Sequence, residues 1–238
     1  MRIVNWNIQR NRPSSWKAKS LIGEIRHLHP DLVCLTEAWA SSLEELDGYS
    51  ISASGVAWSV QKPDERKVLL WSQNPWRQVE VPEELNSIGC AVAGLTRIEN
   101  VDVRVVGICV PYAAASPLGT VPRVSPWVQH EAFLRALAAW LPRWRDQVPL
   151  IVIGDFNRRM PRGKWGSKRA YQLLEDTFAD YQFATMGDLP EVGGRTVDHV
   201  VVSDHFSVEK TTARSAEDET GRIRSDHFGV VVDLRCDP

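Results

Sequence analysis

The chain has 238 residues, of which 43% are hydrophobic and 24% charged, and its 28 basic and 30 acidic side chains leave a formal net charge of −2. This ordinary globular composition excludes a disordered chain, a coiled coil and a polycation, and the length suits one domain over residues 1–238. The longest apolar runs have the length of strands, which excludes a membrane span. The four scattered cysteines form no C-x-x-C pair and no secretion leader is recognisable, so we expect reduced thiols and a cytoplasmic protein.

The first half of the chain predicts a strand, a helix, a second strand and then a series of β-strands. Residues 2–8 are strand-like, and residues 14–29 have apolar side chains at helical spacing up to Pro30. Residues 31–36 form a second apolar strand that ends on Glu37. Turn-forming residues then separate short β-type runs at residues 51–53, 56–60, 67–71, 91–98 and 101–110.

The second half predicts a long helix followed by more strands. Ser125 can cap this helix, with Pro126 at its first position, and apolar side chains recur at helical spacing up to Trp144. We expect strands at residues 150–154, 180–184, 197–202, 207–212 and 228–234, with a short helix at 171–176. Many strands with few helices predict an α/β protein with two stacked, mostly antiparallel sheets and helices outside, a four-layered α/β/β/α sandwich.

Polar residues occur at the ends of four of these strand-like runs. They are Asn7, Glu37, Asp155 with Asn157, and Asp226 with His227. Strand ends on one rim of a sheet converge in space, so these side chains can meet around an ion. Carboxylate and amide oxygens suit Mg²⁺ or Mn²⁺ as a cofactor, whereas zinc favours histidine and cysteine.

Five short motifs contain or accompany these residues. They are Asn-Trp-Asn-Ile (5–8), Leu-Thr-Glu (35–37), Gly-Asp-Phe-Asn (154–157), Val-Asp-His-Val (197–200) and Ser-Asp-His-Phe (225–228). In this order the motifs resemble the endonuclease/exonuclease/phosphatase superfamily, which includes DNase I-like nucleases, apurinic-site endonucleases, sphingomyelinases and inositol-polyphosphate phosphatases. Each motif alone is unspecific, and the resemblance rests on their order over residues 2–234.

The resemblance implies a metal site. Glu37 would be the principal metal ligand, with Asn7 beside it and Asp226 assisting directly or through water. Gln9 stands where several nucleases of the superfamily place an acid. The sequence therefore leaves open whether the site holds one or two metal ions.

The resemblance also implies catalytic roles. Asp155 would orient or deprotonate the attacking water, and Asn157 would hydrogen-bond the phosphate. His227 would stabilise charge on the phosphoryl oxygen, and Asp198 would hold the His227 imidazole in its working tautomer and raise its pKa. These roles match the needs of phosphodiester hydrolysis, which requires charge neutralisation and a water aimed in line.

Two further features need interpretation. Many relatives present a tyrosine or histidine to the phosphate near the position of Cys109; here Tyr112 takes over that contact, or the contact is missing. Ser-Asp-His-Phe also occurs at residues 203–206, directly after the predicted strand 197–202, where it fits a hairpin connection. We therefore assign the catalytic role to the second copy, which precedes the final strand.

A basic run at residues 158–169 carries six basic side chains and no acid. We expect Arg158, Arg159, Lys164 and Lys168 to bind substrate phosphates, with Trp165 available to stack on a base. The structural alternative for this run is a solvated loop.

The other motifs have structural alternatives as well. Asp155 and Asn157 could be turn formers after a strand, and Glu37 could be a charge at the start of a helix near residues 41–46. His199 alternates faces with Asp198 on its strand, so we expect it to be structural.

The expected function is a Mg²⁺- or Mn²⁺-dependent phosphodiesterase that acts on DNA or RNA as an endonuclease or exonuclease. The alternative is a phosphatase or phosphodiesterase of lipids, inositol phosphates or other small molecules. A third hypothesis is a non-catalytic binding module. We expect nucleic acid as the partner, and no obligate protein partner is evident in the sequence.

Overall fold

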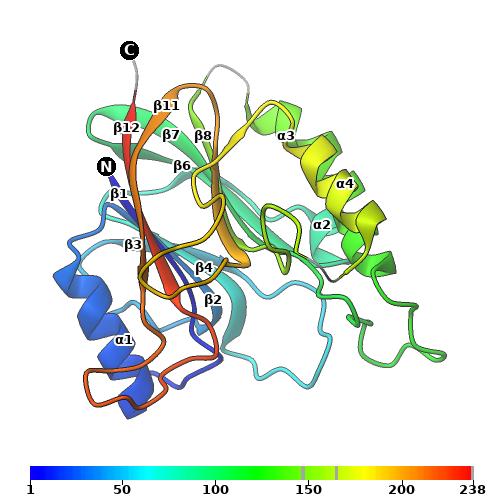
Figure 1. Cartoon of the computed structure of the whole chain (residues 1–238), viewed down its shortest axis with the longest axis horizontal. Helices are drawn as coiled ribbons and strands as arrows, with labels where there is room; N and C mark the ends of the chain where they lie inside the picture. Colours follow the sequence, from blue (N-terminus) through cyan, green and yellow to red (C-terminus); the bar gives the residue numbers. More distant parts are fainter. Residues whose placement is uncertain (146–147, 164–165, 237–238) are drawn as a thin grey trace.

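The computed structural model describes residues 1–145, 148–163 and 166–236, and its strands form two six-stranded sheets (Figure 1). The first sheet has the order β11-β12-β1-β2-β4-β3. Its strands are β1 (Arg2–Asn7), β2 (Leu32–Trp39), β3 (Tyr49–Ala53), β4 (Glu65–Ser72), β11 (Phe206–Arg214) and β12 (Gly229–Cys236). In this sheet β1 and β2 are parallel, and the other neighbours are antiparallel.

The second sheet has the order β5-β6-β7-β8-β10-β9. Its strands are β5 (Arg77–Glu80), β6 (Cys90–Ile98), β7 (Val101–Cys109), β8 (Leu150–Asp155), β9 (Gln182–Phe183) and β10 (Asp198–Val202). Here β7 and β8 are parallel, and the other neighbours are antiparallel.

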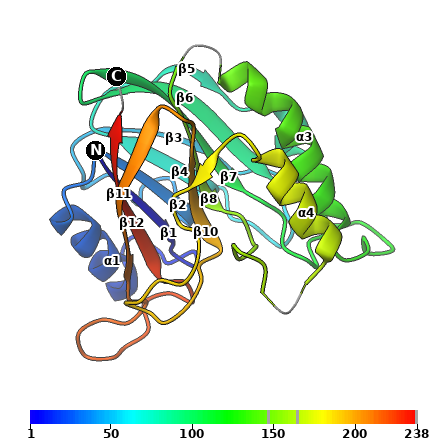
Figure 2. The ribbon, with the colours of Figure 1, turned by 45° about the horizontal axis from the view of Figure 1, so that its top comes forward.

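Helices cover the outer faces of both sheets. They are α1 (Trp16–His27), α2 (Glu83–Asn86), α3 (Val128–Trp144) and α4 (Lys168–Thr177). In both views α1 lies on the side of the first sheet, and α3 and α4 lie together on the side of the second (Figures 1 and 2). The predicted α/β/β/α sandwich is therefore confirmed.

Apolar side chains fill the spaces between these layers. One buried cluster joins the facing sheets through residues such as Ile3, Val105 and Ile153. A second joins the outer face of the second sheet to α3 and α4, and a third joins the first sheet to α1. Because β8 is covered on both faces, all six of its residues are buried, which explains its continuous apolar sequence.

Two local predictions were wrong. Residues 56–60 form no strand. The long helix begins at Val128, and its N-cap is Trp127 with a left-handed φ of 70°, not Ser125 followed by Pro126. The Trp127 amide donates to the Ala113 carbonyl at 2.7 Å, so a loop contact outweighs the local capping pattern.

The connection at residues 203–206 also differs from the prediction. It does not close a hairpin, because β10 belongs to the second sheet whereas β11 pairs with β12 in the first. The helix considered near residues 41–46 is a series of turns, which removes that structural alternative for Glu37. Among the described residues, no helix is both long and apolar enough to traverse a bilayer.

Candidate active site

The predicted residues reach one rim of the sandwich from both sheets. In the first sheet, Asn7 ends β1 beside Thr36 of β2, and in the second sheet Asp155 ends β8 directly opposite Asp198 of β10. The side-chain amide of Asn7 donates from Nδ2 to Asp155 Oδ2 at 3.3 Å and so bridges the two sheets at this rim. Deeper between the sheets, Asn5 Nδ2 donates to the carbonyls of Gly154 and His199.

His227 and Asp198 form a tight pair at this rim. Their Nδ1 and Oδ2 atoms are 2.6 Å apart, and the side chains are 21% and 2% exposed. Burial alone would lower the pKa of His227, but the hydrogen bond and charge of Asp198 raise it to about 9. The imidazole is therefore held as a cation whose Nδ1–H points at Asp198, as the resemblance implied.

The backbone around His227 is fixed by the start of the chain. Trp6 Nε1 donates to the His227 carbonyl at 3.0 Å. The Ser225 hydroxyl donates to the Asn7 carbonyl at 2.7 Å and accepts from the His227 amide. In the first Ser-Asp-His-Phe copy, by contrast, His205 contacts Ser203, so the structure brings only the second copy to Asp198.

Asp155 is buried in the centre of the rim, with 3% of its surface exposed. Its Oδ1 accepts from the Asn157 amide at 2.8 Å. Burial, followed by the charge of Asp198, raises the pKa of Asp155 to about 8, and the Glu37 carboxylate contributes while His227 opposes the shift. A carboxyl group with a pKa near neutrality is suited to accepting a proton from water.

The turn after β8 depends on glycine. Gly154 has a φ of 143°, and a Cβ there would lie 1.9 Å from the Ile108 carbonyl oxygen of the neighbouring strand. Asn157 adopts a φ of 52° and donates from Nδ2 to the Val110 carbonyl at 2.9 Å. The Asn157 side chain thus ties the turn to the end of β7, and its predicted bond to phosphate stays a prediction.

Glu37 lies within β2 with a positive φ of 49°. Its carboxylate is 34% exposed, and its Oε2 is 3.5 Å from Arg10 Nε. The charge of Glu37 raises the pKa of Asp155, so Glu37 lies close enough to the candidate site to interact with it electrostatically. It is not part of the described cluster in which ligand atoms of Asp155, Asp198 and His227 all lie within 4.8 Å of one another.

The donor atoms at the rim fit a hard divalent cation, although not through His227. That ring is a cation bound through Nδ1 to Asp198, so it would repel a metal ion. The remaining donors are oxygens of Asn7, Asp155, Glu37 and the exposed Asp226, the set that Mg²⁺ and Mn²⁺ favour. The buried Oδ1 of Asp198 has no hydrogen-bond partner among the described residues, and its charge makes the electrostatic potential of this site more negative.

The described residues of the basic run differ in their exposure. Arg158 is 6% exposed, donates to the Ser167 carbonyl at 2.7 Å and lies 4.7 Å from the centre of the Trp127 ring, so its guanidinium holds the loop in place. Arg159 and Lys168 are exposed, which leaves them available to a ligand. Lys164, and Trp165 beside it, lie outside the described residues.

Other predicted residues have definite positions. Tyr112 is 42% exposed and packs edge-on against Trp58, with ring centres 5.6 Å apart. His199 is buried, bonded to Thr185 and to the Arg158 carbonyl, as expected for a structural histidine.

Sequence reasoning missed Lys67 of β4. It is 5% exposed, and its Nζ has no hydrogen-bond partner among the described residues. The Nζ lies 3.7 Å from the Trp58 ring centre, and burial lowers the pKa of Lys67. The register that pairs Thr36 with Val68 places Lys67 opposite Glu37. The apolar strand around it hid this cation, and only the strand register shows its proximity to the site.

Comparisons with known proteins agree with this geometry. The model of a family described as "Endonuclease/Exonuclease/phosphatase family" matches residues 4–227 of the chain. No curated protein sequence matches the chain significantly.

Three solved structures have a similar fold. An endonuclease/exonuclease/phosphatase from Bacteroides vulgatus has a TM-score of 0.72 at 14% identity, covering 99% of this chain and 98% of that one. A 3′ phosphatase from Neisseria, bound to product DNA hairpin, has a TM-score of 0.71 at 17% identity, covering 99% of both chains. TDP2 from D. rerio, complexed with single strand DNA product, has a TM-score of 0.70 at 11% identity, covering 99% and 98%. At these identities the likeness concerns the fold.

Proposed function

The chain belongs to the endonuclease/exonuclease/phosphatase family, and from this premise we propose that it hydrolyses phosphodiester bonds in DNA or RNA with the help of a divalent metal ion. The observation that carries the proposal is the buried Asp198–His227 ion pair beside Asp155. The choice of nucleic acid draws support from two proteins of the same fold whose structures contain product DNA.

The side chains divide the work between water and phosphate. Asp155, held by the Asn7 side chain and the Asn157 amide, accepts a proton from the attacking water. His227 presents a positive ring to the phosphoryl oxygens, where charge accumulates in the transition state. Because Asp198 occupies Nδ1, the Nε2 side of the ring is left for the substrate.

The metal ion in this proposal is Mg²⁺ or Mn²⁺, held by Glu37 with Asn7 and Asp226. When bound, it neutralises phosphate charge and stabilises the leaving oxygen. Glu37 and Asp226 keep partly or fully exposed carboxylates at the rim, as a site open to substrate requires.

The test is hydrolysis of plasmid DNA, single-stranded DNA, RNA, bis-p-nitrophenyl phosphate, a phospholipid and an inositol phosphate, each with Mg²⁺ or EDTA. We expect EDTA-sensitive cleavage of a polynucleotide by the wild type and none by Asp155→Asn, which controls for contaminating nucleases. Turnover confined to lipid or inositol-phosphate esters would replace the nucleic-acid proposal with the small-molecule alternative. Absence of metal-dependent turnover on every ester would leave a binding module.

A further inference from the structure

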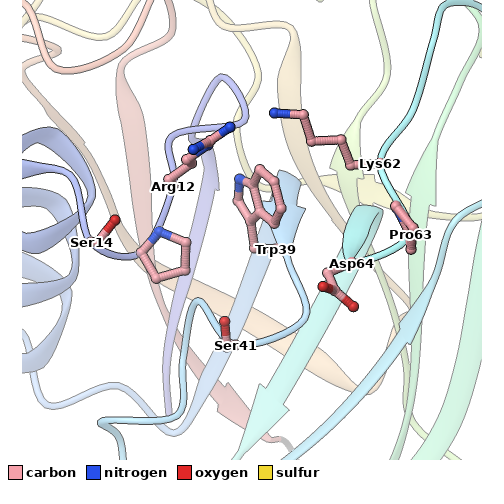
Figure 3. Close-up of a pocket in the computed structure, with 8 residues that line it drawn as sticks. Arg12, Ser14, Trp39, Ser41, Lys62, Pro63 and Asp64 are labelled. Carbon is pink, nitrogen blue, oxygen red and sulfur yellow. The ribbon is translucent and has the colours of Figure 1, made fainter.

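A pocket of about 510 Å³ lies beside the catalytic rim (Figure 3). Three segments form it: the loop after β1, the end of β2 and the loop before β4. The residues that matter here are Arg12, Pro13, Trp39, Lys62, Pro63 and Asp64. The pocket therefore combines an apolar wall of one indole and two proline rings with three charged side chains.

Two cations converge on the Trp39 indole. The Arg12 guanidinium carbon lies 5.9 Å and the Lys62 Nζ 5.5 Å from the ring centre. Figure 3 shows their charged ends directed toward the same space beside the indole, whereas Asp64 points away from it. Both cations are exposed, and neither has a carboxylate of a described residue within 4.0 Å. Two cations without a carboxylate partner, over an aromatic ring, are complementary to a phosphate joined to a flat base.

One residue links this pocket to the catalytic rim. Trp39 Nε1 donates to the Arg10 carbonyl at 2.9 Å, and the Arg10 side chain reaches Glu37 Oε2 at 3.5 Å. The edge of the half-buried indole is thus anchored, with the two exposed cations over its ring. A chain of phosphates with one member at Glu37 and Asp155 would pass Arg10 and reach the pocket next.

We propose that this pocket is a subsite for one nucleotide of a single-stranded segment of the substrate, next to the nucleotide whose phosphate is cleaved. Arg12 and Lys62 contact the flanking phosphate, and the Trp39 face stacks on the base. Stacking requires an unpaired base, which is why the geometry favours a single strand over a continuous duplex. This inference rests on the proposed function and adds to it the strand form of the substrate.

The first experiment measures binding of a fluorescent oligothymidylate of about ten nucleotides in EDTA, so that cleavage plays no part. The variant is Arg12→Ala/Lys62→Ala. Its matched control is Arg143→Ala/Lys210→Ala, which also removes two exposed cations that lack a described carboxylate partner. We expect the first variant to bind the oligonucleotide more weakly. Each phosphate contact contributes about 0.7 to the slope of log K against log salt concentration, so the loss of two contacts should reduce the magnitude of this slope by about 1.4. An unchanged slope, or an equal change in the control, overturns the phosphate contacts.

The second experiment isolates the aromatic face. Trp39→Leu and Trp39→Phe both lose the bond to Arg10, but only the second keeps a ring for stacking. We expect Trp39→Leu to weaken oligothymidylate binding about 5- to 150-fold, the range for one stacked base, and Trp39→Phe to restore most of it. Scanning an abasic position along the oligonucleotide should reveal one position whose base matters to the wild type but not to Trp39→Leu. Equal abasic profiles in both proteins overturn the stacking.

Catalysis separates failure of this inference from failure of the proposed function. Wild type is assayed with bis-p-nitrophenyl phosphate and with the oligonucleotide in Mg²⁺. If neither is cleaved, the proposed function fails. Suppose instead that both are cleaved and that all folded pocket variants match the wild type in oligonucleotide KM, binding and abasic profile. The subsite proposal is then wrong, while the proposed function stands. A raised KM for the oligonucleotide, with thermal midpoints retained, supports the subsite.

Discussion

The Asp198–His227 pair yields the sharpest prediction, through the substitution Asp198→Asn. Asparagine keeps the shape of the side chain but removes the charge that holds the imidazolium. Without that charge, burial acts to lower the pKa of His227 from about 9 toward its ordinary value of about 6.5, because the remaining charges of Asp155 and Asp226 are smaller contributions. At about pH 7.5 the cationic fraction of His227 then falls from roughly 97% toward roughly 10%.

The same substitution affects stability with a definite sign. Because the pKa of His227 is raised in the folded state, its ion pair stabilises the fold below about pH 6.5 and loses this effect as pH rises through about 9. A pKa raised from 6.5 to about 9 corresponds to roughly 3 kcal/mol. Burial raises the pKa of Asp198 itself, and asparagine avoids this cost of a buried charge, so urea unfolding near pH 6 should show a loss smaller than this in Asp198→Asn, and a still smaller loss near pH 10.

The assay is an NMR titration of the imidazole protons in metal-free protein, paired with the pH dependence of kcat/KM. His130 and His199 serve as internal references, since burial lowers the pKa of each to about 4. In Asp198→Asn we expect activity near pH 7.5 to fall about tenfold from loss of the cation alone, and up to about 10⁴-fold with the lost orientation. A His227 that titrates near 6.5 in the wild type, or still near 9 in the variant, would refute the reasoning.

Four further substitutions test other parts of the site. Asp155→Ala and His227→Ala should each lower kcat by about 10²- to 10⁴-fold in steady-state assays while circular dichroism shows a folded protein; near-normal rates in either variant contradict its assigned role. Glu37→Gln should raise the Mg²⁺ concentration for half-maximal activity at least about tenfold, and an unchanged Mg²⁺ titration would remove Glu37 from the metal site. Lys67→Met should raise the free energy of unfolding by about 1 kcal/mol, since it removes a buried ammonium that has no hydrogen bond among the described residues, while the lost contact with Trp58 and the lost attraction of Glu37 offset only part of this gain; destabilisation in urea would show that these two interactions outweigh the cost of burial.

Much of the site could be predicted because its residues occur at strand ends. Asn7 and Asp155 lie where the apolar periodicity stops, whereas Asp198 was implied by the family resemblance, and the sheet register brings Asp155 opposite Asp198. The order of the motifs also selected His227 over His205, and the structure places His227 beside Asp198.

Other features could not be predicted because they depend on contacts between distant segments. Arg158 belongs to a basic run that is typical of a solvated surface, yet Trp127 and the Ser167 carbonyl draw its guanidinium into the fold. The cap of α3 at Trp127 is set by a bond to Ala113, which no local pattern indicates. Likewise, Lys67 is charged within an apolar strand, and its position opposite Glu37 follows only from the pairing of β2 with β4.

The sequence by itself determined the layers of this protein and the chemical character of one rim, because strand periodicity and the polar residues that interrupt it are local properties of the chain. Only the tertiary structure decided which charges meet. Burial raises the pKa of Asp155, and a carboxylate from another strand makes His227 a cation. The pocket around Trp39 likewise exists only because two loops, which carry Arg12 and Lys62, lie beside the end of β2. The physical reason is that the energies of charges and stacked rings depend on distance and solvent access, which are set when the two sheets pack together.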